Sequence, residues 1–344
     1  MIIRFNVYAF MGVRVFEGLV LGVLFPCNHA IWAKWAPPLE RSWLFTITAA
    51  GCPVGTIITM PIAGLLSKYG FDGGWASVFY VTGGVGLTWF FVWSMTIHAT
   101  PDEHPTISVD EYNYITAGLK QSAHEKLSVP WLKILISPAV WACALANFCA
   151  DWGLYTILIC IPKFFIDTGF VASIPYVIKA IVGPTGGYLA DTLISKNISI
   201  RNVRRLIYAI GCTTAGSFIL AVGYAPSPTI ATIFLCIGVG ITGLNATGYA
   251  VNILDIAPKF AGPIMGLCNV FGSMPGFISP QIVGIVTGDK TPGEWRIIFW
   301  ITAIVYGIGI LLFACLVRGE EQPWAISKTE LVKTGECENQ KIKE

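Results

Sequence analysis

Long apolar stretches separated by short polar connections dominate the pattern of residues along this chain. Each stretch is about as long as a helix that crosses a bilayer, which needs roughly 20 mostly apolar residues. Glycine and proline inside them are tolerable, because neighbouring membrane helices can satisfy the freed backbone groups. The pattern predicts an all-α membrane protein with nine transmembrane helices, at residues 9–33, 43–66, 75–97, 137–162, 170–190, 205–223, 229–252, 263–287 and 296–317.

The nine predicted spans are unevenly distributed along the chain. Three precede a polar segment and six follow it, whereas transporters often consist of two six-helix halves joined by a cytosolic loop. We therefore interpret residues 1–97 as a partial N-terminal half, 98–136 as a cytosolic linker, 137–318 as a six-helix C-terminal half and 319–344 as a cytosolic tail. Three helices of the first half are then missing, as in a truncated transcript or gene model. The alternative is a protein that has nine spans.

Basic residues gather in the connections on one side of the predicted bilayer. Cytosolic loops carry an excess of Lys and Arg, and this excess sets the orientation of a membrane protein. The rule places the linker and the C-terminus in the cytosol and the N-terminus on the far side. The basic residues on the cytosolic side are Lys34, Arg41, Lys120, Lys126, Lys133, Lys196, Arg201, Arg204, Arg205, Lys259 and Arg318.

Composition agrees with a lipid environment. Of 344 residues 54% are hydrophobic and 12% are charged, about half the charged share of a soluble domain. The net charge of +2 and the lack of a basic patch with interleaved aromatics exclude nucleic acid as a partner. The sequence contains neither a nucleophile elbow nor a phosphate-binding glycine loop, so it gives no indication of an enzyme. Nine of the ten cysteines lie in apolar stretches without metal-ligand spacing, so we expect no metal, no cofactor and no disulfide framework.

Two charged residues lie inside the first apolar span, where charge is costly and marks a candidate functional site. Arg14 lies about one and a half turns into this span, and its planar guanidinium suits a carboxylate or phosphate. The alternative is an Arg that snorkels to the interface. Glu17 shares the helix face of Arg14. A carboxylate in low dielectric can exchange a proton near neutrality, so Glu17 is a candidate coupling group; the alternative is a structural pair with Arg14.

Asp151 and Lys179 lie near the middle of consecutive spans. Two unpaired charges at that depth would be costly, which predicts an intramembrane ion pair. A lone neutralised Lys179, or one that faces a water-filled cavity, is the alternative.

Several strings resemble the organic anion–cation symporters of the major facilitator superfamily. This family includes sialin, the vesicular glutamate transporters and the type I sodium–phosphate cotransporters. The most specific string is Trp-Ala-Pro-Pro-Leu-Glu-Arg, and the similarity runs from about residue 10 to residue 325. The matching strings lie at residues 14–19, 25–42, 75–81, 187–191, 252–258, 293–296 and 319–325.

This resemblance implies a major facilitator helical bundle that moves a small organic or inorganic anion by alternating access, in symport with a proton or sodium. The implied substrate-binding residues are Arg14, His29, Tyr155 and Asn252, with Glu17 as coupling group; for His29 the alternative is a hydrogen-bonded packing residue. The implied gating loops, in which charges close a helix end against a neighbouring helix terminus, contain Glu40, Arg41, Asp191, Arg204 and Arg205.

The chain departs from the family pattern at two intramembrane positions. Leu21 stands where proton-coupled members carry an acid, which weakens the case for proton coupling. Ala150 stands where the vesicular glutamate transporters carry an Arg, which argues against glutamate and leaves sialin-like or phosphate-transporter-like specificity open. The membrane is either the plasma membrane or that of a vesicle or lysosome.

Two other functions remain in view. A truncated isoform that does not transport could associate with full-length transporters and regulate them. A membrane receptor or channel would not explain the Trp-Ala-Pro-Pro-Leu-Glu-Arg string at residues 35–41.

Overall fold

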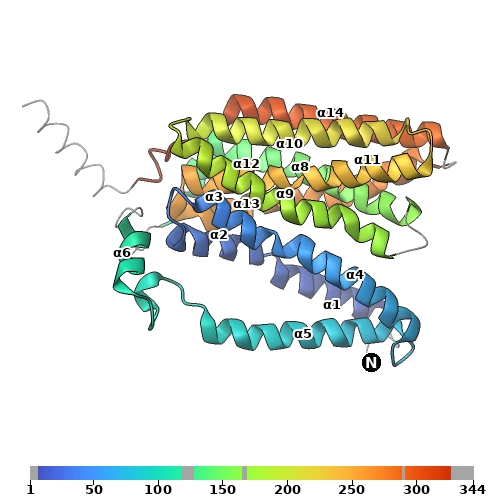
Figure 1. Ribbon diagram of the computed structural model, residues 1–344, viewed down its shortest axis with the longest axis horizontal. Coiled ribbons are helices and arrows are strands. Elements are labelled where there is room, and N and C mark those ends of the chain that lie inside the picture. Colours follow the sequence, from blue (N-terminus) through green and yellow to red (C-terminus); the bar gives the residue numbers. More distant parts are fainter. Residues whose placement is uncertain (1–6, 118–127, 165–168, 289–290, 327–344) are drawn as a thin grey trace, which may run out of the picture.

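The computed structural model of the 344-residue chain describes residues 7–117, 128–164, 169–288 and 291–326, and all regular structure in these ranges is helical (Figure 1). Parts of the predicted linker and tail, including Lys120 and Lys126, lie outside the described residues. The first helices along the chain are α1 (Val7–Leu21), α2 (Leu24–Trp35), α3 (Arg41–Ala49), α4 (Gly51–Tyr69) and α5 (Trp75–Thr96). The predicted linker contains η2 (Pro101–Glu103), α6 (Val109–Ala117) and α7 (Trp131–Ile136). The later helices are α8 (Pro138–Phe164), α9 (Gly169–Ser195), α10 (Ile200–Val222), α11 (Pro228–Ile241), α12 (Gly243–Ile256), η3 (Pro258–Phe260), α13 (Ala261–Val286) and α14 (Pro292–Leu316).

Helices long and apolar enough to cross a membrane occur where the sequence predicts them. Seven such segments are found among the described residues, and they coincide with seven of the nine predicted spans. They are Val7–Trp35, Arg41–Tyr69, Trp75–Thr96, Ile200–Val222, Pro228–Ile256, Pro258–Val286 and Pro292–Leu316. The other two predicted spans coincide with α8 and α9, which are 27 residues long but are not among the seven. The multi-pass helical membrane fold is therefore confirmed, whereas the number nine stays a prediction.

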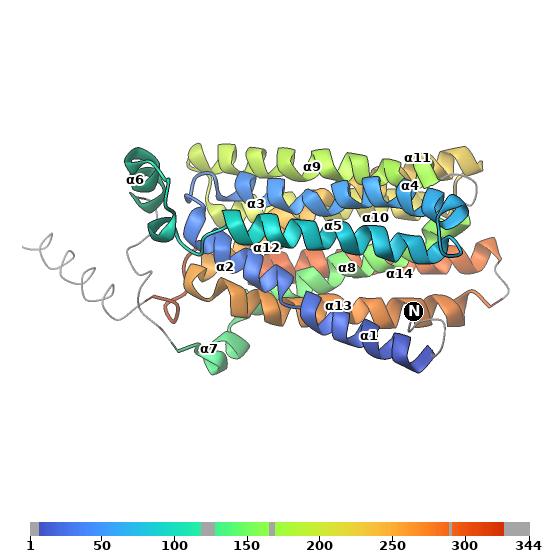
Figure 2. The ribbon, with the colours of Figure 1, turned by 90° about the horizontal axis from the view of Figure 1, so that it is seen from below.

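The helices α8 to α14 pack against one another in one bundle, and the earlier helices lie along its side (Figures 1 and 2). The core of the bundle is built by buried faces such as that of α10, where Ile207, Gly211, Ala215 and Ile219 recur at helical spacing. This face packs on α11, α12 and α14. Helices α3 and α4 lie against α9, α2 lies against α13, and α5 runs along α4. The earlier helices therefore reach the bundle mainly through α9 and α13.

Burial differs sharply between the two groups of helices. Helix α1 has no buried residue and α5 has two, Ala76 and Ser77, whereas α10 has ten. The outward side chains of α1 and α5 are large and apolar, as at Leu19, Val85 and Phe90. Such continuous apolar surface is rare on soluble monomers, and it is compatible with lipid as the surrounding solvent.

One prediction concerns orientation. The linker helix α6 lies at one end of the bundle, and the connection between α13 and α14 lies at the other end (Figure 1). Because the basic loops mark the cytosol, a peptide tag inserted within residues 105–125 should resist a membrane-impermeant label in intact cells. A control tag in the connection after Val286 should be labelled. Labelling of the first tag without permeabilisation would overturn the orientation.

Candidate functional site

A cavity of about 610 Å³ lies between the two groups of helices. Its lining comes from α2, α3, α4 and α5 on one side and from α8, α9, α12 and α13 on the other. Most lining side chains are apolar or aromatic. Among the described residues that line it, Asp151 and Lys179 are the charged ones, and His29 is the histidine. A cavity shared by two helical groups is where a bundle of this kind would hold a solute.

Lys179 reaches the cavity from α9 at a place where α11 and α12 meet. The helical segment breaks at Thr242, and α12 starts at Gly243 directly against α9. A Cβ atom on Gly243 would lie 2.8 Å from the Lys179 carbonyl oxygen and 2.9 Å from the backbone nitrogen of Gly183. Glycine at this break therefore permits the close approach that closes the cavity wall beside Lys179.

Asp151 reaches the same cavity from the middle of α8, opposite Gly272 of α13. A Cβ atom on Gly272 would lie 2.6 Å from Oδ2 of Asp151, so the missing side chain leaves room for this carboxylate. The structure brings Asp151 and Lys179 into one cavity, close enough for their charges to attract. It does not bring them into direct contact: among the described ion pairs within 4.0 Å, none joins these two residues.

His29 is fully buried on α2 and connects it to α12. Its Nδ1 atom lies 3.0 Å from the Phe25 carbonyl oxygen, and its Nε2 atom lies 3.2 Å from the Ala250 carbonyl oxygen. A neutral imidazole has one N–H and can donate to one of these oxygens, whereas the doubly protonated ring donates to both. The ring also packs edge-on against Phe45 of α3, with 4.8 Å between ring centroids.

At the end of the bundle nearest α6, two buried arginines share one carboxylate. Arg204 of α10 is 1% exposed, and its Nε donates to Asp255 Oδ2 at 2.8 Å. Its Nη1 donates to the Ser42 hydroxyl of α3 at 2.8 Å. Arg41 of α3 lies 3.6 Å from Asp255 Oδ1 and donates to the Leu254 carbonyl at 3.0 Å. The start of α3 is thereby bound to α10 and to the end of α12.

A second carboxylate binds the first turn of α3. The backbone N–H groups of Ser42 and Trp43 donate to the Asp191 carboxylate of α9 at 3.3 Å and 2.8 Å. These amides have no partner within the helix, and the positive end of the helix dipole favours a carboxylate there. A Cβ atom on Gly187 would lie 2.6 Å from the Ser42 carbonyl oxygen and would also meet the Thr46 hydroxyl. The glycine thus lets α9 approach α3 closely enough for this bond.

Two arginines and two aspartates meet at this junction, so their charges cancel, as buried charges require. We call this group the latch, and it consists of Arg41, Ser42, Trp43, Asp191, Arg204 and Asp255. Every bond in it that involves α3 crosses from residues 1–97 to residues 137–318.

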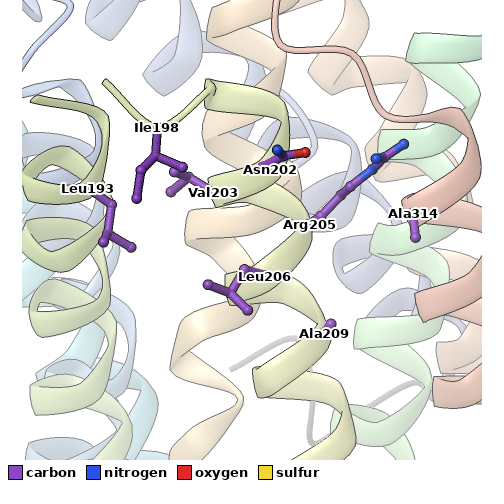
Figure 3. A pocket seen from close by; sticks show the side chains of 8 residues that line it. All are labelled: Leu193, Ile198, Asn202, Val203, Arg205, Leu206, Ala209 and Ala314. Atoms are coloured by element: carbon purple, nitrogen blue, oxygen red, sulfur yellow. The ribbon is translucent and has the colours of Figure 1, made fainter. Parts of the chain in front are cut away.

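Two residues predicted for the gating loops lie beside the latch. Glu40 accepts a hydrogen bond from the Tyr114 hydroxyl of α6 at 2.7 Å, which ties the linker to the start of α3 and raises the pKa of Tyr114. Arg205 lines a separate groove of about 410 Å³ between α9, α10 and α14 (Figure 3). In Figure 3 its side chain extends toward Ala314, away from Leu193 and Ile198 on the far wall.

Arg14 and Glu17 form a pair on α1. Arg14 Nη1 donates to Glu17 Oε2 at 2.9 Å, and the side chains are 46% and 48% exposed. The guanidinium also lies over the ring of Phe79 of α5, 5.1 Å from its centroid. Neither residue is among those that line the cavity.

The other two candidate substrate-binding residues also lie outside the cavity lining. Tyr155 packs its ring against Gly276 of α13, where a Cβ atom would lie 3.1 Å from Tyr155 Cζ. Asn252 is fully buried, and its amide donates to the Arg318 carbonyl at 2.7 Å. In this structure Asn252 therefore joins α12 to the segment that follows α14.

Asp255 belongs to the latch, but the sequence analysis assigned it no function. It occurs inside one of the strings that carry the family resemblance, at residues 252–258, but nothing in the string marks its carboxylate as the partner of two arginines. The one feature of the sequence that could have indicated this role is the position of an acidic residue at the end of an apolar span. Ser42 and Trp43 take part through backbone amides and a hydroxyl, which sequence motifs rarely reveal.

These features define a multi-pass helical membrane protein with a cavity between two helical groups and a cluster of buried, bonded charges at one end. The family model described as Major Facilitator Superfamily matches residues 1–280 and, in a second match, residues 169–335. The chain belongs to this superfamily. Its transporters are not enzymes, in agreement with the sequence.

Relatives with about 40% identity support the same assignment. The chain is 41% identical over 337 residues to the uncharacterized transporter slc-17.2 of Caenorhabditis elegans, covering 94% of this chain and 68% of the relative. It is 40% identical over 327 residues to vesicular glutamate transporter 2 of Homo sapiens, covering 91% of this chain and 56% of the relative. It is 40% identical over 329 residues to vesicular glutamate transporter 2.2 of Danio rerio, covering 92% of this chain and 56% of the relative. The chain thus spans a little over half the length of these glutamate transporters, and the relatives fit the resemblance to organic anion–cation symporters.

The close approach at Gly187 yields a prediction. Gly187→Ala places a methyl group against the Ser42 carbonyl oxygen, so α9 or α3 must move, at a cost of about 1–3 kcal/mol for an overpacked site. Amide hydrogen exchange of residues 41–46 should accelerate about tenfold or more. Gly84→Ala in α5 is the matched control, because no atom lies within 4 Å of a Cβ there. Unchanged exchange in Gly187→Ala would mean that this contact does not hold the latch closed.

Proposed function

We propose that this protein is a secondary active transporter of small organic or inorganic anions, coupled to a proton or sodium and working by alternating access. The observation that carries the proposal is the cavity between residues 1–97 and residues 137–318, closed at the linker end by the latch. A shared cavity with a closure that crosses between two helical groups is what alternating access requires.

The latch joins the two parts of the protein that would move against each other in the proposed mechanism. We treat residues 1–97 and 137–318 as the two bodies that rock against each other, with the linker between them. Opening toward the latch end would require Asp255 and Asp191 to release α3. Arg41 would then lose its carboxylate, and Arg204 would keep Asp255 but lose the Ser42 hydroxyl, so the open state must rehydrate these groups. Solute binding shifts the balance only insofar as it favours one state over the other.

Arg14 and Glu17 supply the proposed coupling. Their pair is accessible, since each side chain is nearly half exposed. An anion can therefore compete with Glu17 for the paired donors of the guanidinium. A proton on Glu17 would remove its charge and free Arg14 for the anion, so binding of proton and anion would favour each other. Sodium near Glu17 would act in the same sense.

Lys179 is the cation that the cavity itself offers to a solute. It lies on α9 within the cavity lining, whereas Arg14 lies on α1 outside that lining. We propose that Lys179 holds the anionic group of the solute while the latch is closed. The name of the human relative identifies it as a glutamate transporter. For this chain the residue Ala150, at the position of a family Arg, favours another anion.

Uptake into liposomes tests the proposal. The purified chain is reconstituted and offered labelled phosphate, sialic acid, glutamate and urate, under an inward proton gradient or an inward sodium gradient. We expect accumulation of at least one anion other than glutamate, driven by one of the gradients. Liposomes that accumulate none of the four under either gradient would contradict the assignment.

Arg14 provides the sharpest variant. Lysine keeps the charge but loses the planar fork, so Arg14→Lys should lower anion uptake about tenfold, and Arg14→Ala should nearly abolish it. Arg296, whose Nε donates to the Gly223 carbonyl at 2.8 Å, is the control, and its replacement by Lys should leave uptake within about twofold. If Arg14→Ala transports at the wild-type rate and reaches the membrane normally, Arg14 is an interfacial anchor and not a substrate ligand.

A further inference from the structure

We propose that the groove beside Arg205 binds an anionic phospholipid of the surrounding membrane, with the headgroup phosphate at Arg205 and Arg201 and an acyl chain along the apolar side chains of the groove. The groove measures about 410 Å³ and lies between α9, α10 and α14 (Figure 3). The described residues that line the groove and those that line the cavity between the two helical groups are different sets. The proposed lipid site is therefore separate from the proposed solute site, and neither depends on the other.

The groove changes from polar to apolar along α10. Asn202 and Arg205 lie near the start of this helix, whereas Leu206 and Ala209 lie further along it. In Figure 3 the Arg205 side chain extends toward Ala314 and toward the end of α10 at which Asn202 lies. A long basic side chain often reaches toward the membrane surface in this way. A phospholipid presents the same order, with its charge at the membrane surface and its acyl chains toward the bilayer centre.

Apolar side chains form the walls of the groove. Leu193 lies near the end of α9, Ile198 lies in the connection to α10, and Ala314 lies on α14. Ile198 and Leu206 are exposed at the surface of the protein. An acyl chain would cover these side chains, whereas a free inorganic anion would leave them uncovered. The groove therefore favours an amphipathic ligand over a simple anion.

The two arginines at the groove have no acceptor in the protein. The Nε atoms of Arg201 and Arg205 are shielded from solvent, and neither donates a hydrogen bond to any described residue. The ion pairs among the described residues use neither arginine, whereas the neighbouring Arg204 is paired with Asp255. Arg201 lies four residues before Arg205, so both project from the same side of α10. Guanidinium groups without a carboxylate of their own can offer paired donors to a phosphate.

Positive charge prevails around the groove. Residues 192–205 contain four basic residues and no acidic residue. The segment after α14 passes the start of α10, where a Cβ atom on Gly319 would lie 2.5 Å from the Arg201 backbone nitrogen. Residues 318–321 of that segment carry one basic and two acidic residues. The charges of Lys196, Arg201 and Arg205 outweigh this excess, so net positive charge remains to attract an anionic headgroup.

The end of the bundle that carries the groove is also the end with the basic loops. These loops predict that this end faces the cytosol. Cytosolic leaflets contain anionic lipids that attract Lys and Arg, and basic pockets between membrane helices on that side are typical sites for anionic headgroups. Charge and apolar surface thus indicate the same class of ligand.

A lipid series on the wild-type chain tests this class. The chain is purified in detergent micelles and titrated with dioleoylphosphatidylglycerol, with dioleoylphosphatidylcholine, and with glycerophosphoglycerol, which is the anionic headgroup without acyl chains. Native mass spectrometry counts the bound molecules. The first phosphatidylglycerol should bind about fivefold more tightly than the first phosphatidylcholine, and about tenfold more tightly than the headgroup alone. Equal affinity for the two lipids would overturn the inference, and equally tight binding of the headgroup would do so by indicating a free anion as the ligand.

Photolabelling locates the lipid on the wild-type chain. A phosphatidylglycerol with a diazirine in one acyl chain should label residues 193–210 and 306–316 more strongly than α5, whose apolar side chains are exposed to any lipid. Unlabelled phosphatidylglycerol in excess should suppress this labelling, and phosphatidylcholine should not. Labelling of the groove no stronger than that of α5 would overturn the inference.

Charge variants assign the headgroup to the arginines. Arg205→Gln should weaken binding of phosphatidylglycerol about fivefold, the contribution of one basic residue, and leave binding of phosphatidylcholine unchanged. Arg205→Lys keeps the charge and should remain within about twofold of the wild type. Arg296→Gln, near the opposite end of α14 from Ala314, is the control and should change neither affinity. If Arg205→Gln binds phosphatidylglycerol as tightly as the wild type, Arg205 does not bind the headgroup and the inference fails. The labelling experiment decides the location even where a variant fails to fold.

Discussion

Arg204 carries a permanent charge in the interior of the protein, and much of the arrangement around the cavity follows from that charge. A buried guanidinium must be matched by a carboxylate and must have its donors satisfied. Asp255 supplies the carboxylate from the end of α12, and Ser42 accepts a second bond from the start of α3. The same carboxylate lies 3.6 Å from Arg41. One buried charge thereby fixes the relative positions of α3, α10 and α12, and with them one end of the cavity.

The latch and the cavity use charge in opposite ways. In the latch, opposite charges are in contact, so the bonds stabilise one packing of the helices and resist water. In the cavity, Asp151 and Lys179 are close but not in contact, so they remain available to a bound molecule. Glycines make both arrangements possible: Gly187 brings α9 against α3, and Gly243 brings α12 against α9. Substitution at these glycines would therefore displace the helices that carry these charged side chains.

The apolar pattern predicted where the helices lie because a hydrocarbon layer dictates their length, and seven of the predicted spans coincide with membrane-length helices. The family strings drew attention to Arg41, Asp191 and Arg204, which meet in the latch. The pattern could not show which charged residues face one cavity, because that depends on the rotation of each helix about its axis. Asp151 and Lys179 share the cavity, whereas Arg14 lies outside its lining. Nor could the pattern show that Asp255 pairs with Arg204, which lies 51 residues away in the sequence, because this pairing depends on how the helices pack.

The cancellation of charge between Asp151 and Lys179 has an electrical consequence. A membrane potential does work on any net charge that crosses it, about 2.3 kcal/mol per elementary charge for each 100 mV. When both side chains are ionised their charges sum to zero, so reorientation of the empty cavity would then carry no net charge from them. Any voltage dependence of a transport cycle would then come from the solute and its coupling ion. The empty carrier would return at a rate that the membrane potential neither speeds nor slows through this pair.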